Sequence, residues 1–190
     1  MKLVWDNQQF KVTIKQVDIY ITPEKLPPFP INAIVIEQDT SLILEPDDKI
    51  RDSGDDKPLW YDANTAQLST SHQPGDVIIK PGKPIRLFAI VHDLDQTPSW
   101  QTEWIETALK HIFTIINEKR FPAIRLPVLG TQFGRIKLDE FVSILIQVLK
   151  QHHFDHPLRV WLAVKPEKCQ VICDLFNKKL NFKDNKSMLD

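Results

Sequence analysis

The chain has 190 residues, of which 42% are hydrophobic, and its formal net charge is −1. This length supports one well-buried core rather than two. The near-neutral charge argues against a protein that binds nucleic acid or an anionic membrane, and no apolar run approaches the roughly 20 residues that cross a bilayer. The first residues lack the apolar region of a signal peptide, so we expect a cytoplasmic protein whose partners include no nucleic acid and no membrane.

The first half of the chain predicts strands joined by irregular segments. Residues 10–14 and 17–21 alternate apolar with polar side chains and are rich in β-branched types, which indicates a pair of strands. After a proline-rich link, residues 33–36 form a continuous apolar run, typical of a strand buried on both faces. Residues 39–74 are acidic with few apolar positions near their middle, so we expect a long surface excursion there.

In the second half, strand patterns alternate with amphipathic helical patterns. The predicted strands are residues 77–79, 87–91, 123–128 and 159–164, and the predicted helices are residues 99–119, 138–150 and 166–179. Alternation of this kind favours parallel strands joined by right-handed crossovers, whereas the opening strand pair is close to a hairpin. We therefore expect an α/β fold with a mixed, mostly parallel sheet and helices on both faces. It forms one domain over residues 1–182, followed by a frayed tail at 183–190.

The most informative stretch is residues 121–134, in which an apolar run breaks into Gly130-Thr-Gln-Phe-Gly134 before an amphipathic segment. This order predicts a strand, a glycine loop and a helix. Glycines at such a junction let the backbone approach a ligand, and the following helix amino end favours an anion. A phosphate-bearing ligand at the carboxyl end of a strand is one interpretation. A plain structural turn is the other.

Several segments together resemble a macro domain, over roughly residues 12–179. Leu126-Pro-Val-Leu-Gly-Thr-Gln-Phe-Gly134 is similar to the second phosphate loop of that family, and Asn32-Ala-Ile-Val35 to the start of its buried strand. Asp18-Ile19 resembles the family's Gly-Asp-Ile motif, and residues 75–79 and 88–92 resemble its two middle strands. The resemblance implies a three-layer α/β/α module that binds ADP-ribose, and some members hydrolyse ADP-ribosyl esters or glycosides.

The resemblance implies a set of ligand-binding residues: Asp18, Gly130, Thr131, Gln132, Phe133 and Gly134. Asp18 would contact the adenine, and the loop would hold phosphate or ribose. The alternatives are an ordinary solvated aspartate in a hairpin and a simple turn, with Phe133 either stacking on the ligand or packing inside the turn. No catalytic residue is assigned.

The sequence also departs from the family pattern. Where the family has Asn-Ala-Ala-Asn and then a glycine-rich loop, this chain has Ile36-Glu-Gln-Asp39 and then carboxylates, and Gln132 replaces a glycine. Glu37 and Asp39 could act as a general base or as magnesium ligands, or they could be a solvated strand end. His92 ends a strand at the same edge, either as a functional residue or as a packed histidine.

Other candidate metal ligands give weaker patterns. His152 and His156 are four residues apart near Asp155, but a zinc site needs three or four fixed ligands, and this stretch is predicted to connect a helix and a strand. Cys169 and Cys173 match no common zinc spacing and are expected to be reduced, partly buried thiols. We therefore expect neither a metal site nor a cofactor.

Three functions remain open at this stage. The first is a module that binds ADP-ribose or a related nucleotide through residues 130–134 without turnover. The second is a structural or protein-interaction module with a degenerate pocket, whose acidic loop at residues 45–56 contacts a protein partner. The third is an ADP-ribosyl hydrolase that uses Glu37, Asp39 or the carboxylates of that loop around a cation.

Overall fold

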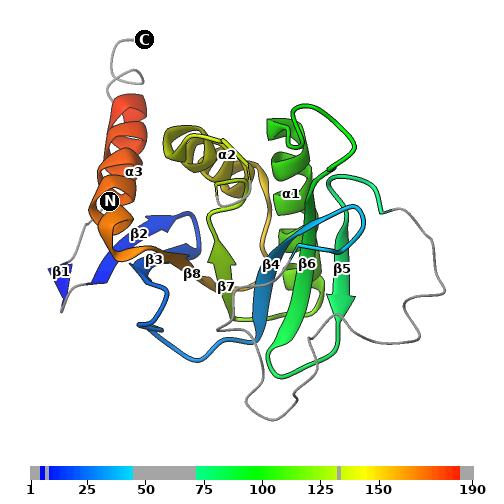
Figure 1. The fold of residues 1–190 in the computed structure, drawn as a ribbon. Coiled ribbons are helices and arrows are strands. Elements are labelled where there is room, and N and C mark those ends of the chain that lie inside the picture. Colours follow the sequence, from blue (N-terminus) through cyan, green and yellow to red (C-terminus); the bar gives the residue numbers. More distant parts are fainter. Residues whose placement is uncertain (1–4, 7–8, 45–71, 132–133, 185–190) are drawn as a thin grey trace.

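The computed structural model describes residues 5–6, 9–44, 72–131 and 134–184, which form a single eight-stranded sheet (Figure 1). The strands lie in the order β1-β2-β3-β8-β7-β4-β6-β5. Their bounds are β1 Trp5–Asp6, β2 Gln9–Ile14, β3 Val17–Pro23, β4 Ala33–Asp39, β5 Val77–Lys80, β6 Ile85–His92, β7 Ala123–Pro127 and β8 Leu158–Val164. The five central strands pair in parallel, and β1, β2 and β5 pair antiparallel at the two edges. The predicted α/β class and the mixed, mostly parallel sheet are confirmed.

Three helices follow the strands of the second half as the hydrophobic periodicity predicts. They are α1 Thr102–Glu118, α2 Leu138–Gln151 and α3 Cys169–Asp184. A short 3-10 helix, η3 Pro166–Lys168, precedes α3, so the last helix begins three residues later than predicted. Proline suits such a first turn because its fixed φ matches the turn and its missing N–H is not needed there. The helix also continues five residues beyond the predicted end, to Asp184.

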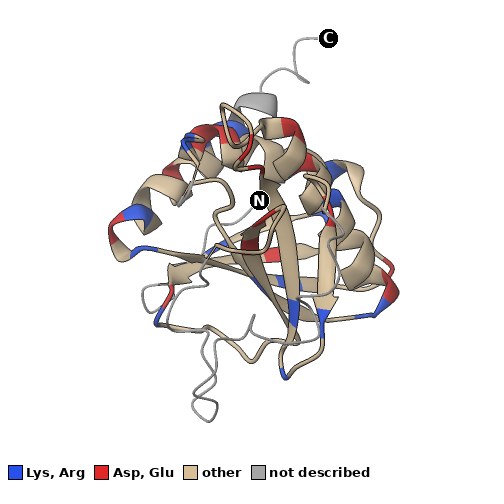
Figure 2. Cartoon of the chain, turned by 45° about the vertical axis from the view of Figure 1, so that its right-hand side comes forward, with Lys and Arg blue, Asp and Glu red and all other residues tan. Residues whose placement is uncertain are grey.

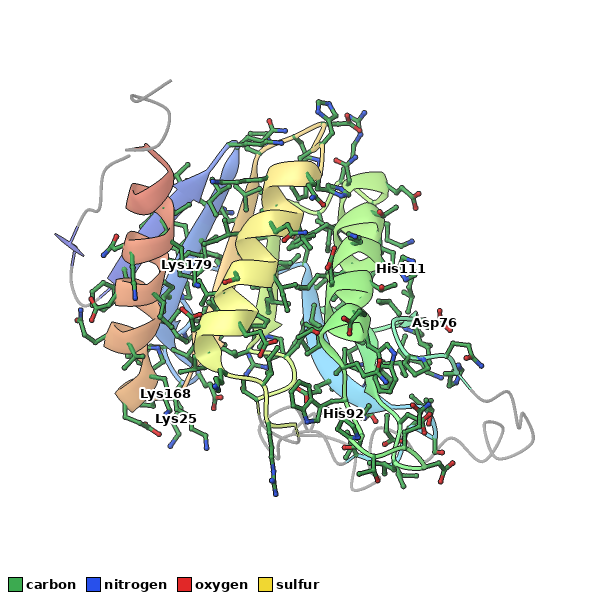
Figure 3. All side chains as sticks on the ribbon, turned by 90° about the horizontal axis from the view of Figure 1, so that it is seen from above. Lys25, Asp76, His92, His111, Lys168 and Lys179 are labelled. Carbon is green, nitrogen blue, oxygen red and sulfur yellow. The ribbon has the colours of Figure 1, made fainter. Side chains whose placement is uncertain are left out.

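All three helices pack against one face of the sheet, as the view down onto that face shows (Figure 3). The prediction of helices on both faces is therefore wrong for the part of the chain that the structure describes, because the hydrophobic faces of all three helices share one core cluster. α1 contacts β5 and β6, α2 contacts β2, and α3 contacts β3. Alternate residues of the central strands point to this side, and they share one buried cluster with helical residues such as Ile112, Phe141 and Phe176. This alternation is the period-2 pattern of a half-buried strand, and the cluster is the main core of the fold.

The opposite face of the sheet carries a smaller apolar cluster. Ile34, Ile36 and Phe88 are buried there, packed against Ile31, Leu42 and Ile78. Among the described residues, this cluster contains strand and loop positions and no helical ones. The predicted burial of residues 33–36 on both faces is therefore confirmed, since alternate positions of β4 belong to the two clusters. Most of the predicted acidic excursion, residues 45–71, and the end of the predicted tail, residues 185–190, lie outside the described residues.

Charged residues occur along the helices and near the ends of strands in the described part of the chain (Figure 2). Figure 2 shows basic and acidic residues mixed along the three helices, which fits the formal net charge of −1. Within the described ranges, no helix is long and apolar enough to span a bilayer.

Candidate functional site

The candidate site lies where three neighbouring parallel strands end. β4 ends with Glu37, Gln38 and Asp39, β6 ends with His92, and Gly130 follows three residues after the end of β7. Because β4 pairs in parallel with both β6 and β7, the carboxyl ends of all three strands meet at one edge. Ligands of open α/β sheets bind in the crevice outside this edge.

Glu37 is the centre of this arrangement, and it is almost fully buried. One carboxylate oxygen, Oε1, pairs with Nε2 of the buried His92, and the other, Oε2, accepts the backbone N–H of Gly130 at 3.0 Å. A buried carboxylate is costly unless charge or hydrogen bonds compensate it, and here each oxygen has a partner. Glu37 therefore links the ends of β4 and β6 to the glycine loop.

Asp39 is completely buried and closes the turn that follows β4. Its Oδ1 accepts the N–H of Ser41 at 2.7 Å, and its Oδ2 accepts the N–H groups of Ile43 at 3.0 Å and Leu44 at 2.8 Å. Three amide donors saturate most of the acceptor capacity of the carboxylate. The alternative of a solvated strand end at Glu37 and Asp39 is therefore wrong, because both side chains are buried and hydrogen-bonded.

The glycine loop is a tight turn whose two glycines lack room for a side chain. Gly130 has φ of +74°, and a Cβ there would lie 2.5 Å from Cδ1 of Ile105 and 3.0 Å from Cγ2 of Ile136. A Cβ on Gly134 would lie 2.4 Å from the carbonyl oxygen of Gly130. Thr131 donates its hydroxyl to the carbonyl of Val128 at 2.7 Å, and Ile136 N–H donates to the carbonyl of Gly130 at 3.3 Å. The backbone thus folds back on itself immediately after β7.

The six predicted ligand-binding residues are not all brought together. Gly130, Thr131 and Gly134 lie in the turn described above, whereas Gln132 and Phe133 lie outside the described residues. Asp18 is at the amino end of β3 and pairs in register with Arg159 of β8. Arg159 in turn pairs with Ala123 at the start of β7, so Asp18 lies beside the first residue of β7 in the direction of the strands. At about 3.3 Å per residue, Pro127 at the end of β7 is roughly 13 Å further along the sheet.

Asp18 instead takes part in the hairpin of β2 and β3. It accepts the hydroxyl of Thr13 at 2.7 Å and pairs with Nζ of Lys11 at 2.8 Å. The hydrogen bond to Asp18 raises the pKa of the Lys11 ammonium. The structure therefore separates Asp18 from the glycine loop, because its Asp-Ile pair begins a strand and the loop follows the far end of a parallel neighbour.

The histidines after α2 have structural contacts. The ring of His152 packs beside Phe113 and Phe154, and Nε2 of His156 donates to the carbonyl of Phe121 at 3.1 Å. His153 lies 3.6 Å from Asp155 at the surface. In the described ranges, no group of three or more histidine, cysteine or acidic residues could hold a metal ion.

The two cysteines are free and buried in α3. Burial raises the pKa of the Cys169 thiol and raises that of Cys173 well above its usual range. Neutral, buried thiols of this kind are inert and pack as small apolar side chains.

The sequence singled out Glu37, His92 and Gly130 separately but did not predict that they would meet. The missing information was the order of the strands, since these residues are far apart in the chain and become neighbours only when β4 lies between β6 and β7. A carboxylate, a histidine and a glycine that each end a predicted parallel strand are the signal that could have indicated this contact.

Several solved structures have a fold similar to that of this chain. The macrodomain of Oceanobacillus iheyensis with ADP is 17% identical with a TM-score of 0.68, covering 94% of this chain and 97% of that one. A variant of that macrodomain with ADPR is 17% identical with a TM-score of 0.67, covering 93% and 99%. A Trypanosoma brucei macrodomain in complex with ADP is 12% identical with a TM-score of 0.57, covering 84% and 68%. No protein-family model and no curated protein matches the sequence. At these identities the likeness establishes a shared fold.

Proposed function

Since this chain has the macrodomain fold, we propose that it binds ADP-ribose or a related nucleotide at residues 130–134, without turnover. The observation that carries the proposal is the position of the glycine turn. It follows β7 at the edge where β4 and β6 also end, which is where ligands of open α/β sheets bind. Similar structures with ADP or ADPR support a ligand of this class.

The surroundings of the turn favour an anion. Arg135 and Lys137 are exposed immediately after the turn, and α2 begins at Leu138 with its amino end toward the same edge. Basic side chains and the positive end of a helix dipole both stabilise a phosphate. Three carboxylates oppose this attraction: Glu37 and, in the first turn of α2, Asp139 and Glu140. Glu37 is held inside the sheet edge by His92 and Gly130, and Asp139 pairs with Lys179 at 2.8 Å, so Glu140 is the exposed carboxylate that most reduces the attraction for an anion.

The hydrogen bonds of the two buried carboxylates support binding without turnover. A general base needs a free lone pair within hydrogen-bond distance of the proton that it removes. Asp39 accepts three backbone amides, and Glu37 accepts one amide and pairs with a buried histidine. Both carboxylates are also buried, so little of either is open to a water molecule that it could activate.

The second candidate is a structural or protein-interaction module with a degenerate pocket. The observation that favours it is that Gly130 N–H, a donor that a phosphate could use, already donates to Glu37. In this case the amide is occupied by the protein itself, and the turn binds nothing. The acidic loop at residues 45–56, the proposed contact for a protein partner, lies outside the described residues.

Titration calorimetry with ADP-ribose, with and without magnesium, separates the two candidates. A Gly130→Val variant is unsuitable, because its Cβ would strike the core residue Ile105 and binding could be lost through unfolding. Thr131→Glu and Thr131→Gln form a better pair, since both lose the hydroxyl bond to Val128 and only one adds charge. We expect micromolar binding that Thr131→Gln retains within a few-fold and that Thr131→Glu weakens at least about tenfold, because like charges repel at close range.

Two outcomes would change this conclusion. The absence of heat at millimolar ADP-ribose, in a protein shown to be folded by circular dichroism, would leave the degenerate pocket as the better proposal. Release of ADP-ribose from an ADP-ribosyl ester or glycoside, especially with a magnesium requirement, would contradict binding without turnover and favour the hydrolase.

A further inference from the structure

We propose a second ligand site, for a small organic cation such as an alkylammonium or guanidinium group, between β5 and α1 at the edge of the sheet. An open cavity of about 320 Å³ lies there at the protein surface. Its polar lining comes from His72, Asp76, His111 and Thr114. Figure 3 shows Asp76 and His111 together along the outer side of α1, apart from His92 and the candidate nucleotide site. The proposal does not depend on nucleotide binding.

His111 presents a hydrogen-bond acceptor to this cavity. Its Nδ1 lies 2.8 Å from the carbonyl oxygen of Gly75, and a carbonyl only accepts, so Nδ1 carries the hydrogen. In the neutral ring, Nε2 then has a free lone pair. Gly75 is itself fixed, since its N–H donates to the carbonyl of Ile90 at 2.7 Å. The backbone therefore sets the tautomer and the orientation of the imidazole.

Asp76 and Thr114 add further acceptors. Oδ2 of the half-buried Asp76 accepts the N–H of Gln73 at 3.1 Å, and a carboxylate offers about four acceptor positions in total. The Thr114 hydroxyl donates to the carbonyl of Lys110 at 3.0 Å, so its hydrogen is used and its lone pairs remain. The lining is thus rich in acceptors. His111 and Thr114 are exposed, so water reaches these acceptors, and a ligand that replaces this water must be a donor.

The charge of the lining also favours a cation as the ligand. Asp76 is the carboxylate of the lining, and its charge favours a cation and disfavours a phosphate or carboxylate. The remaining wall is apolar, formed by Val77, Ile78 and Ile115, and can pack against a short aliphatic stem. A volume of about 320 Å³ is at the low end for ligand sites and suits a group smaller than a nucleotide.

Amide chemical shifts in a nitrogen-15 NMR titration test the site with defined probes. n-Butylammonium and n-butylguanidinium should shift signals of residues 72–78 and 111–115 with millimolar affinity, whereas 1-butanol and pentanoate, which share the butyl stem but lack the cation, should not. Asp76→Asn keeps the shape and an acceptor for Gln73 N–H, and it should weaken cation binding about tenfold. Asp174→Asn, a matched change at an exposed position of α3, should leave the affinity unchanged.

Thr114→Val provides a second variant, because it keeps the side-chain shape and removes the acceptor, and we expect a few-fold loss. The spectrum of each variant also reports whether the fold is intact. Equal shifts with 1-butanol, or an affinity that neither Asp76→Asn nor Thr114→Val changes, would overturn the proposal. Tighter binding of a lysine or arginine peptide than of the free amine would support the site and identify a protein side chain as the source of the cation.

Discussion

Glu37 and Gly130 are 93 residues apart in the sequence, and the carboxylate of Glu37 accepts the backbone N–H of Gly130 at 3.0 Å. The contact crosses from the end of β4 to the loop after β7, which is the neighbouring strand in the sheet. Because the other oxygen of Glu37 pairs with His92 of β6, one side chain connects three strand ends. The backbone of the glycine turn is therefore held by a charged group from within the protein.

Removal of this carboxylate should destabilise the fold. Glu37→Ala leaves the Gly130 N–H and the buried His92 without their shared acceptor, which we expect to lower the free energy of unfolding by roughly 2–4 kcal/mol. Glu37→Gln keeps one carbonyl oxygen for Gly130 and should cost about 1 kcal/mol less than the alanine variant. Urea unfolding followed by circular dichroism measures both. Equal stability of the wild type and Glu37→Ala would show that the bridge contributes nothing.

The sequence predicted the elements of the fold better than the contacts between them. Hydrophobic periodicity places α1 and α2 within three residues of their observed ends, because burial of one helix face depends on local spacing alone. The meeting of Glu37, His92 and Gly130 depends on strand order, which no local pattern records. The separation of Asp18 from the glycine loop has the same cause, because a short motif does not reveal which end of a strand it occupies.

Asp39 should matter to stability more than to any reaction. Asp39→Ala leaves three backbone N–H groups without their acceptor in a fully buried turn, and we expect a loss of roughly 2–4 kcal/mol in the free energy of unfolding. Ser41→Ala is a suitable control, since it keeps the backbone N–H that Ser41 donates to Asp39, and it should change stability by less than about 0.5 kcal/mol. If Asp39→Ala unfolds at the same urea concentration as the control, the turn does not depend on this carboxylate.

The cost of replacing Gly130 should be smaller when the core residue Ile105 is shortened as well. Gly130→Ala places a Cβ in the left-handed region, at φ of +74°, and 2.5 Å from Cδ1 of Ile105, so we expect a loss of roughly 2–4 kcal/mol. Ile105→Val removes that methyl group and alone should cost about 1 kcal/mol. The double variant should therefore be more stable than the sum of the single losses predicts, with a coupling of about 1 kcal/mol in a double-mutant cycle. Strict additivity would show that backbone strain, rather than contact with Ile105, accounts for the effect.

His152 should make the stability of the protein depend on pH. Burial against Phe113 and Phe154 lowers the pKa of His152, and the positive charges of His153 and Lys15 lower it further. Below a pH of about 6.5, the unfolded chain therefore binds a proton that the folded protein binds only at lower pH, and stability falls as the pH decreases through this window.

The expected result is a larger loss of stability between pH 7.5 and pH 5.5 in the wild type than in His152→Gln, measured by urea unfolding at both values. His153→Gln is the matched control, because the side chain of His153 is 89% exposed and contributes only through its charge on His152. It should retain most of the pH dependence. If His152→Gln loses as much stability as the wild type over this range, the pH dependence of stability arises from other groups. The partly buried ring of His152 would then accept its proton as readily in the folded protein as in the unfolded chain.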